Sequence, residues 1–377
     1  MEHENFLQLQ ERIEQFVNGP ARAMSDSIEA DGVVTPNMRR ELERHDLFRL
    51  ARPTTYGGLG LPFADYLELL GTLSEMHGSL RVLVHVANSI WRTLDGHLTE
   101  AQMRSFGQSL LSGERWMTFT LSEPNSGSGT DIRTTARRQT NGYTLRGEKW
   151  MIIFSDFTDY FLTFCRLEGT RGKEGTMALL VPRDTPGLTV EPMAGAMGIT
   201  GTVHGHLRFD DCFVPEQYRI GSEGDGLRVA FDGFLHPSRT AIAMTCVGLA
   251  NRALQIAVAH AKERVTFGKS LADRPTIQFW LAEMATDIEA ARHLTRAAAK
   301  AFDDGHLPPE MAAMAKYFAA DMLQRVTDKA LQIHGGIGYF KSSEMERIYR
   351  DARMQRFEEG TAETQKMVIA RRLLTDA

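Results

Sequence analysis

Residues 118–131 read TFTLSEPNSGSGTD, a short strand-like run that ends in a loop of serines, glycines and one glutamate. The loop gathers hydroxyl groups and bare backbone amides at a strand edge, where they can donate to a phosphate or to the edge of a flavin ring. Composition alone favours a solvated turn. The glycines are not a dinucleotide-binding fingerprint, because Ile132 stands where a third glycine is needed.

The pattern on either side of this loop divides the chain into three parts. Residues 1–113 carry apolar side chains at helical spacing, and residues 226–377 return to long helices. Between them, residues 114–225 carry short aromatic and β-branched runs separated by Gly, Pro, Asn and Asp, which is typical of a small β-domain. The order predicts an α+β fold: an N-terminal helical domain, a middle β-domain and a C-terminal helical domain. The predicted strands are 116–121, 143–153, 160–167, 177–181 and 206–209, and the predicted helices include 6–17, 65–76, 239–265, 276–303 and 309–334.

The overall charge argues against two classes of partner. The 377 residues include 43 Lys and Arg against 48 Asp and Glu, a formal net charge of −5, with no dense basic block. Neither nucleic acid nor an anionic membrane surface fits this balance. The most apolar stretch, 241–250, is shorter than the roughly 20 residues of a membrane-spanning helix.

The termini and the cysteines favour a reducing compartment. Residues 1–10 are polar and acidic, without the basic start and apolar run of a secretory signal. Three scattered cysteines, without CxxC pairing, argue against a disulfide framework or a zinc site. We therefore expect a cytoplasmic protein. No metal site is predicted, because His204 and His206 have no third ligand at a suitable spacing.

Four other segments carry chemistry, although each has an ordinary structural interpretation alone. RVTFG at 264–268 suits a nucleotide clamp or simply the end of a helix. QIHGGIG at 332–338 closes a helix with glycines. RFEEGTAETQ at 356–365 suits either a carboxylate held against a ligand or the acidic entry to a helix. Arg239 opens a bundle helix, where it pairs with an anionic group or with water.

In order and spacing these segments resemble the flavin-dependent acyl-CoA dehydrogenase family over nearly the whole chain. The resemblance implies a β-barrel-like middle domain and a C-terminal four-helix bundle. It also implies FAD, bound non-covalently between subunits of a homodimer that usually belongs to a homotetramer, and an acyl-CoA or acyl-carrier-protein thioester as substrate. The motifs that carry it are PTTYGGLG (53–60), SEPNSGS (122–128), RVTFG (264–268), QIHGGIG (332–338) and EGT (359–361).

The resemblance also implies individual site residues. Those that hold FAD are Leu121, Ser122, Ser128, Met151 and Ile153 from the β-domain, Arg264, Thr266, Phe267, Gln332 and Gly336 for the adenine-diphosphate half bound mainly by the neighbouring subunit, and Thr361 and Glu363. Those that meet the substrate are Ser128, Arg239 and Gly360, with Arg81 at the position where family members that act on dicarboxylic thioesters hold the distal carboxylate. A bidentate clamp suits that position, and an exposed helix Arg is the alternative.

Glu359 matches the catalytic base of the family. A proton on the carbon next to a thioester carbonyl is weakly acidic, so its removal needs a desolvated carboxylate and donors on the carbonyl oxygen. In the family those donors are the backbone amide of the base and a ribityl hydroxyl of FAD. Some members carry the base just before the matching Arg, where this chain has Ser238. Glu359 is therefore the candidate, with Glu358 the weaker neighbour.

The chain departs from the family pattern beside the flavin. The usual Trp-Ile-Thr is replaced by Met151, Ile152 and Ile153, so a covering ring and a hydroxyl near N5 are both lost. Trp150 offers a substitute only after a small shift. These replacements therefore leave open whether electron-transferring flavoprotein re-oxidises the flavin, as it usually does in the family. The loop after Ser128 is also a residue short, and Pro275 replaces a Gln often found near FAD.

Three functions remain open on these residues. The first is an FAD enzyme that introduces an α,β-double bond into an acyl thioester. The second uses the same site as an enoyl-thioester reductase, or for another flavin reaction on a CoA-bound or carrier-bound acyl group, and Met151 and Ile153 motivate it. The third is a non-catalytic flavin-binding or assembly protein.

Overall fold

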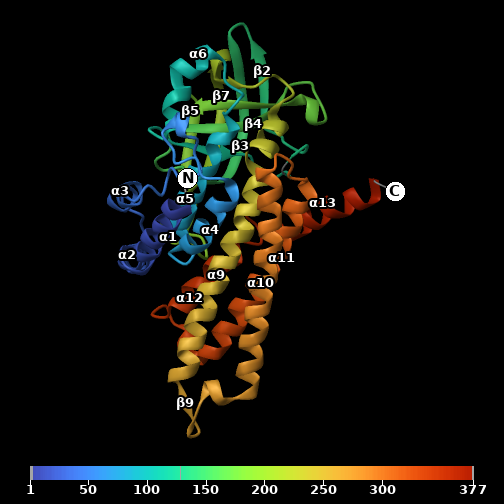
Figure 1. The fold of residues 1–377 in the computed structure, drawn as a ribbon. Helices are drawn as coiled ribbons and strands as arrows, with labels where there is room; N and C mark the ends of the chain where they lie inside the picture. Colours follow the sequence, from blue (N-terminus) through green and yellow to red (C-terminus); the bar gives the residue numbers. More distant parts are fainter. Residues whose placement is uncertain (1–2, 128, 376–377) are drawn as a thin grey trace.

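The structure is a computed structural model, and it describes residues 3–127 and 129–375. The N-terminal part is helical, as predicted (Figure 1). Local signals start its helices: the Thr35 side chain accepts from the Met38 amide at 3.3 Å, and Pro36 opens the next helix. The elements are α1 (His3–Asn18), α2 (Pro20–Asp31), α3 (Pro36–Arg44), η1 (Thr54–Tyr56), α4 (Phe63–Leu73), α5 (Gly78–Ser89), η2 (Ile90–Thr93), α6 (Glu100–Gln102), the π-helical turn η3 (Met103–Gly107) and α7 (Gln108–Ser112).

The middle part is a sheet whose described strands follow the order β6-β7-β3-β2-β4-β5-β8, with β1 paired to β4. Its strands are β1 (Met117–Thr120), β2 (Thr135–Gln139), β3 (Gly142–Ile153), β4 (Tyr160–Leu167), β5 (Thr176–Pro182), β6 (Leu188–Pro192), β7 (His204–Pro215) and β8 (Arg219–Ile220). The pattern missed β2 and β6, because β2 is largely polar and β6 is an edge strand with little burial. β2 lacks the alternation that marks a half-buried strand, and β6 alternates between half-buried and exposed residues over only a short stretch.

The C-terminal part forms the long arm of the molecule, in which α9, α10 and α11 run side by side (Figure 1). α13 packs on α11 near the sheet, and the β9–β10 hairpin lies at the opposite end of the arm. The elements are α8 (Gly226–Ala230), the π-helical turn η6 (Phe231–Leu235), α9 (His236–Glu263), β9 (Val265–Thr266), β10 (Lys269–Ser270), η7 (Leu271–Asp273), α10 (Pro275–Asp303), α11 (Pro309–His334), η8 (Gly335–Tyr339), α12 (Glu344–Met354) and α13 (Ala362–Thr375).

Helix α9 is the centre of the main core. The helical run Gly226–Glu263 is long and apolar enough to cross a membrane by length and composition, which the short stretch 241–250 did not indicate. However, 72% of its most apolar window is buried inside the fold, so packing accounts for its hydrophobicity. α4 approaches it closely, since a Cβ on Gly248 would lie 2.1 Å from the Gly71 carbonyl oxygen. Glycine at this crossing lets α4 and α9 touch through their backbones.

Candidate active site

Glu359 lies in the turn between α12 and α13. Its φ is +56°, a left-handed conformation that is uncommon for a residue with a side chain, and Gly360 follows at +99°. The Thr364 amide then donates to the Thr361 hydroxyl at 3.3 Å and begins α13. Thr361 therefore caps α13, and the sharp turn before it sets the direction of Glu359.

Three buried side chains hold the carbonyl groups of this turn. Lys316 Nζ donates to the Gly360 oxygen at 2.7 Å, and Arg239 Nε donates to the Glu359 oxygen at 3.2 Å. Gln365 Nε2 donates to both oxygens, at 3.1 Å and 3.2 Å. The Glu359 N–H, in contrast, has no hydrogen-bond partner among the described residues. A ligand carbonyl next to Glu359 would therefore find a free backbone donor.

The Glu359 carboxylate is in an environment that favours its protonated form. Burial raises its pKa to about 7, and the charge of Glu358 adds to the rise. A hydrogen bond from Ser238 and the positive charges of Arg239 and Lys316 lower the pKa only in part. A carboxyl group with a pKa near 7 can both accept and release a proton at neutral pH.

Ser238 is fixed by a neutral histidine from α5. His85 Nε2 lies 2.9 Å from Ser238 Oγ, and His85 Nδ1 lies 3.4 Å from Ser89 Oγ. Burial lowers the pKa of His85 to about 3, so the ring is uncharged at neutral pH. The pair orients a hydroxyl toward Glu359 without adding a charge.

Arg81 is not the exposed helix residue considered as its alternative. Its side chain is 1% exposed, and its Nη2 lies 3.3 Å from Glu358 Oε2. That expectation is wrong because every residue of α5 is buried. The guanidinium is thus paired within the chain, and a substrate carboxylate would compete with Glu358 for it.

The expected flavin-facing residues of the β-domain come together. The Trp150 amide donates to the Ser122 oxygen at 2.9 Å, which joins β3 to the end of β1. Beside this contact a register shift in β3 gives Met151 a φ of +58° and leaves its side chain 54% exposed. Leu121 is buried, and Ile153 is half-buried. Ser128, the remaining β-domain residue, lies outside the described residues.

The Trp150 ring packs against a histidine. Its centroid lies 5.7 Å from that of His206 in an edge-on arrangement. His206 Nε2 in turn lies 2.6 Å from Glu148 Oε2. Within residues 3–127 and 129–375, no cluster of three or more His, Cys, Asp or Glu side chains that could hold a metal is found.

A second group gathers at the far end of the bundle, beside the β9–β10 hairpin and away from α13 (Figure 1). There the rings of His260 on α9 and His334 on α11 stack with centroids 4.5 Å apart, which brings the end of α9 to the end of α11. Phe267, at the tip of the hairpin, is 99% exposed. The residues of this group are Arg264, Thr266, Phe267, Gln332 and Gly336. These residues lie far from Thr361 and Glu363 along the bundle. A single chain therefore does not bring the two sets of expected FAD residues into one site.

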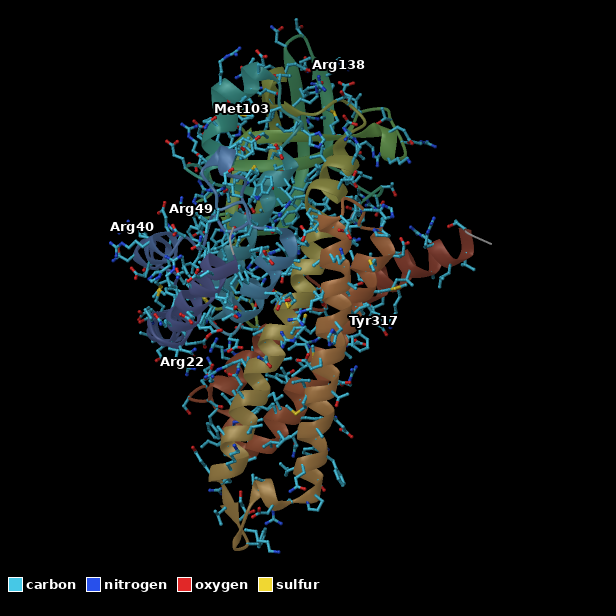
Figure 2. All side chains as sticks on the ribbon, in the orientation of Figure 1. Arg22, Arg40, Arg49, Met103, Arg138 and Tyr317 are labelled. Carbon is cyan, nitrogen blue, oxygen red and sulfur yellow. The ribbon has the colours of Figure 1, made fainter. Side chains whose placement is uncertain are left out.

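Several residues that shape the site were missed from the sequence. Lys316 is fully buried, whereas Tyr317 beside it lies on the outer side of α11 (Figure 2). The signal was present, since Lys316 is the one charged residue in the apolar run 311–320. Lys149 is another: its Nζ donates to the Leu121 oxygen at 3.0 Å and to Glu123 Oε1 at 2.8 Å. Figure 2 also places Arg138 at the tip of the sheet, away from both groups.

Comparisons with known proteins agree over the whole chain. Three family descriptions match in order: "Acyl-CoA dehydrogenase, N-terminal domain" at 3–114, "middle domain" at 118–212 and "C-terminal domain" at 224–374. An acyl-CoA dehydrogenase of Bacillus subtilis (strain 168) is 36% identical over 337 residues, 89% of each chain. The acryloyl-CoA reductase (NADH) of Anaerotignum propionicum is 32% identical over 368 residues, 96% of this chain and 92% of that one. Butyryl-CoA dehydrogenase from Megasphaera elsdenii has a TM-score of 0.91 at 30% identity, with 98% of both chains covered. With sequence, domain order and fold in agreement, the chain belongs to the acyl-CoA dehydrogenase family.

Proposed function

We propose that this chain is an FAD-dependent acyl-CoA dehydrogenase in which Glu359 removes the α-proton of an acyl thioester. The single observation that carries the assignment is the Glu359 turn, where a carboxyl group with a pKa near 7 lies beside a backbone N–H that has no hydrogen-bond partner among residues 3–127 and 129–375. That N–H would hold the thioester carbonyl and stabilise the negative charge that develops as the proton leaves. Arg239, Lys316 and Gln365 keep the N–H in place by holding the carbonyl groups of the same turn.

The residues present suit FAD at both expected places. Within the described part of the chain, the Ser122 hydroxyl forms no hydrogen bond and Arg264 forms no ion pair, so both are available to a ligand. Phe267 is 99% exposed, with the Arg274 guanidinium 5.9 Å from the centroid of its ring, and it offers a stacking surface for a planar group. When bound, FAD accepts the hydride that leaves the β-carbon of the substrate. The separation of the two groups along the bundle supports a site shared by subunits of a homodimer or homotetramer.

The test of this function is reduction of the flavin by thioesters. We expect the purified protein to be yellow and to bleach without oxygen when a saturated acyl-CoA is added, measured by the loss of flavin absorbance near 450 nm. A panel of chain lengths, branched acyl groups and carrier-protein thioesters would identify the substrate. If no thioester bleaches the flavin, the assignment is wrong. We propose electron-transferring flavoprotein as the electron acceptor of the reduced flavin. We also propose that the protein acts in the cytoplasm.

The reverse reaction is the second candidate. Met151 and Ile153 remove the usual ring and hydroxyl beside the flavin, and one relative is named as a reductase. In a reductase, an enoyl thioester would re-oxidise the reduced flavin faster than the saturated thioester reduces the oxidised flavin. Stopped-flow comparison of the two half-reactions on the same carbon chain separates the functions.

Arg264 provides a test of the cofactor site. Arg264→Gln should weaken FAD retention about tenfold, because a charge-assisted hydrogen bond contributes roughly 1.5–3 kcal/mol. Ultrafiltration followed by absorbance of the free flavin measures the loss. Lys262→Gln, an exposed cation two residues earlier, is the matched control and should retain FAD. Equal retention by both variants would remove Arg264 from the site.

A further inference from the structure

Arg81 and Glu358 form a buried ion pair directly beside the proposed base. Arg81 Nη1 and Nη2 donate to Glu358 Oε1 and Oε2 at 3.4 Å and 3.3 Å, and the two side chains are only 1% and 12% exposed. Gln355, with its amide oxygen turned toward Arg81, accepts from Nη2 at 3.1 Å and donates to Glu358 Oε2 at 3.1 Å. A buried charge is stable only with a partner of opposite sign and satisfied hydrogen bonds. Arg81 and Glu358 supply the opposite charges, and Gln355 adds a hydrogen bond to each side chain, whereas Arg81 Nε has no hydrogen-bond partner among the described residues.

The position of the pair couples it to Glu359. Glu358 and Glu359 are neighbours in one half-buried turn, and two carboxylates that close together repel each other. Arg81 comes from α5, in the N-terminal domain, and reaches across 277 positions of sequence to neutralise only the first of them. The other titratable or charged groups that face the two carboxylates are Arg239 and Cys246 on α9, Lys316 on α11 and His204 on β7. Of Arg81, Arg239 and Lys316, only Arg81 forms an ion pair with Glu358 in the described part of the chain.

We propose that Arg81 is a positioning residue, which holds the Glu358 carboxylate beside Glu359 and thereby sets how readily Glu359 gives up its proton. The inference rests on the proposed role of Glu359 as base. Glu358 makes Glu359 a stronger base, and Arg81 limits that effect so that Glu359 is still ionised at neutral pH. With its guanidinium engaged in this way, Arg81 is not the group that selects a dicarboxylic substrate.

Opposite charge changes should move the ionisation of Glu359 in opposite directions. Glu358→Gln removes the repulsion and leaves Arg81 uncompensated, so the pH at which flavin reduction is half-maximal should fall by about one unit. Arg81→Gln leaves Glu358 uncompensated, so the same midpoint should rise by about one unit. The midpoint of the double variant should return near the wild-type value. Arg81→Lys keeps the positive charge, so its midpoint should lie closer to wild type than that of Arg81→Gln. The measurement is the rate of anaerobic flavin bleaching between pH 5 and pH 9.

Thermal unfolding gives a second reading that needs no turnover. The melting temperature is measured from pH 5 to pH 9 in wild type, Arg81→Gln and Glu358→Gln, each with and without the additional change Glu359→Gln. The advantage of Glu359→Gln grows with pH between the unfolded-state pKa and the folded-state pKa of Glu359, and it levels off above the folded-state pKa. That plateau should begin at lower pH in Glu358→Gln and at higher pH in Arg81→Gln. If no thioester bleaches the flavin, the proposed function fails, and this comparison still decides the role of Arg81.

The Arg252–Glu344 pair is the matched control. It is a partly buried Arg–Glu pair from the same bundle, with hydrogen bonds of 2.9 Å and 2.6 Å, and it lies away from Glu359. Arg252→Gln and Glu344→Gln should lower the melting temperature without moving either midpoint. Shifts of the same sign in Arg81→Gln and Glu358→Gln would mean mere loosening of the turn and would overturn the proposal. It is also overturned if Arg81→Gln abolishes turnover of glutaryl-CoA while butyryl-CoA keeps the wild-type pH profile.

Discussion

Glu359→Gln should slow flavin reduction by a saturated acyl thioester about 10³-fold at pH 8, because the amide cannot accept the α-proton and a positioned base contributes roughly 10²–10⁴-fold. Binding of the thioester should change little, since the backbone N–H and the volume of the side chain are kept. Stopped-flow bleaching gives the rate, and the spectral shift on binding an enoyl-CoA gives the affinity. Glu289→Gln, on the exposed face of α10, is the control and should behave as wild type.

The same variant should be more stable than wild type at high pH. Glu359 has a pKa of about 7 in the folded protein against 4.5 as its ordinary value, so the folded state binds more protons between these two pH values. Its contribution to stability is therefore present below pH 4.5 and is lost as the pH rises to about 7. We expect the melting temperature of Glu359→Gln to exceed that of wild type by a few degrees at pH 8 and to equal it below pH 4.5. Identical curves at both pH values would contradict the burial of an ionising carboxyl.

Arg239→Gln should lower the rate of flavin reduction about 10²-fold at pH 7. Two effects combine: the hydrogen bond from Nε to the Glu359 oxygen is lost, and a positive charge that favours the ionised carboxylate is removed. Displacement of a catalytic group by about 1 Å can alone cost 10²-fold. His236, the nearest ring, cannot replace the charge, because burial lowers its pKa to about 4. The pH–rate profile should also shift to higher pH.

Arg252→Gln is the matched control for Arg239→Gln. Arg252 is a buried Arg on the same helix, but it pairs with Glu344 instead of the Glu359 turn. We expect this variant to lose stability and to keep the rate per folded, flavin-loaded molecule. If the two variants lose rate equally, the effect comes from α9 as a whole. Arg239→Lys should restore part of the pH profile and less of the rate, because it keeps the charge without the planar donor geometry.

The long elements could be predicted because each is a local pattern. The run 309–334 coincides with α11, and 160–167 coincides with β4. Strands without alternation, such as β2, were missed for the same reason. α5 was also hard to place from periodicity, since a helix that is buried on all sides has no polar face to set its period.

The sequence by itself determined the three-part α+β order and the family motifs, because these depend on residue type and on spacing along the chain, and the resemblance carried by those motifs pointed to Glu359 as the candidate base. Only the tertiary structure decided the surroundings of that base. Lys316 and Arg81 come from α11 and α5 and meet the Glu359 turn through contacts that no local spacing encodes, whereas Gln365 lies only six residues after Glu359, in α13. The pKa of Glu359 depends on its burial and on the charges of Glu358, Arg239 and Lys316. A carboxylate that is ordinary in sequence thus becomes a base suited to neutral pH only when side chains from distant helices enclose it.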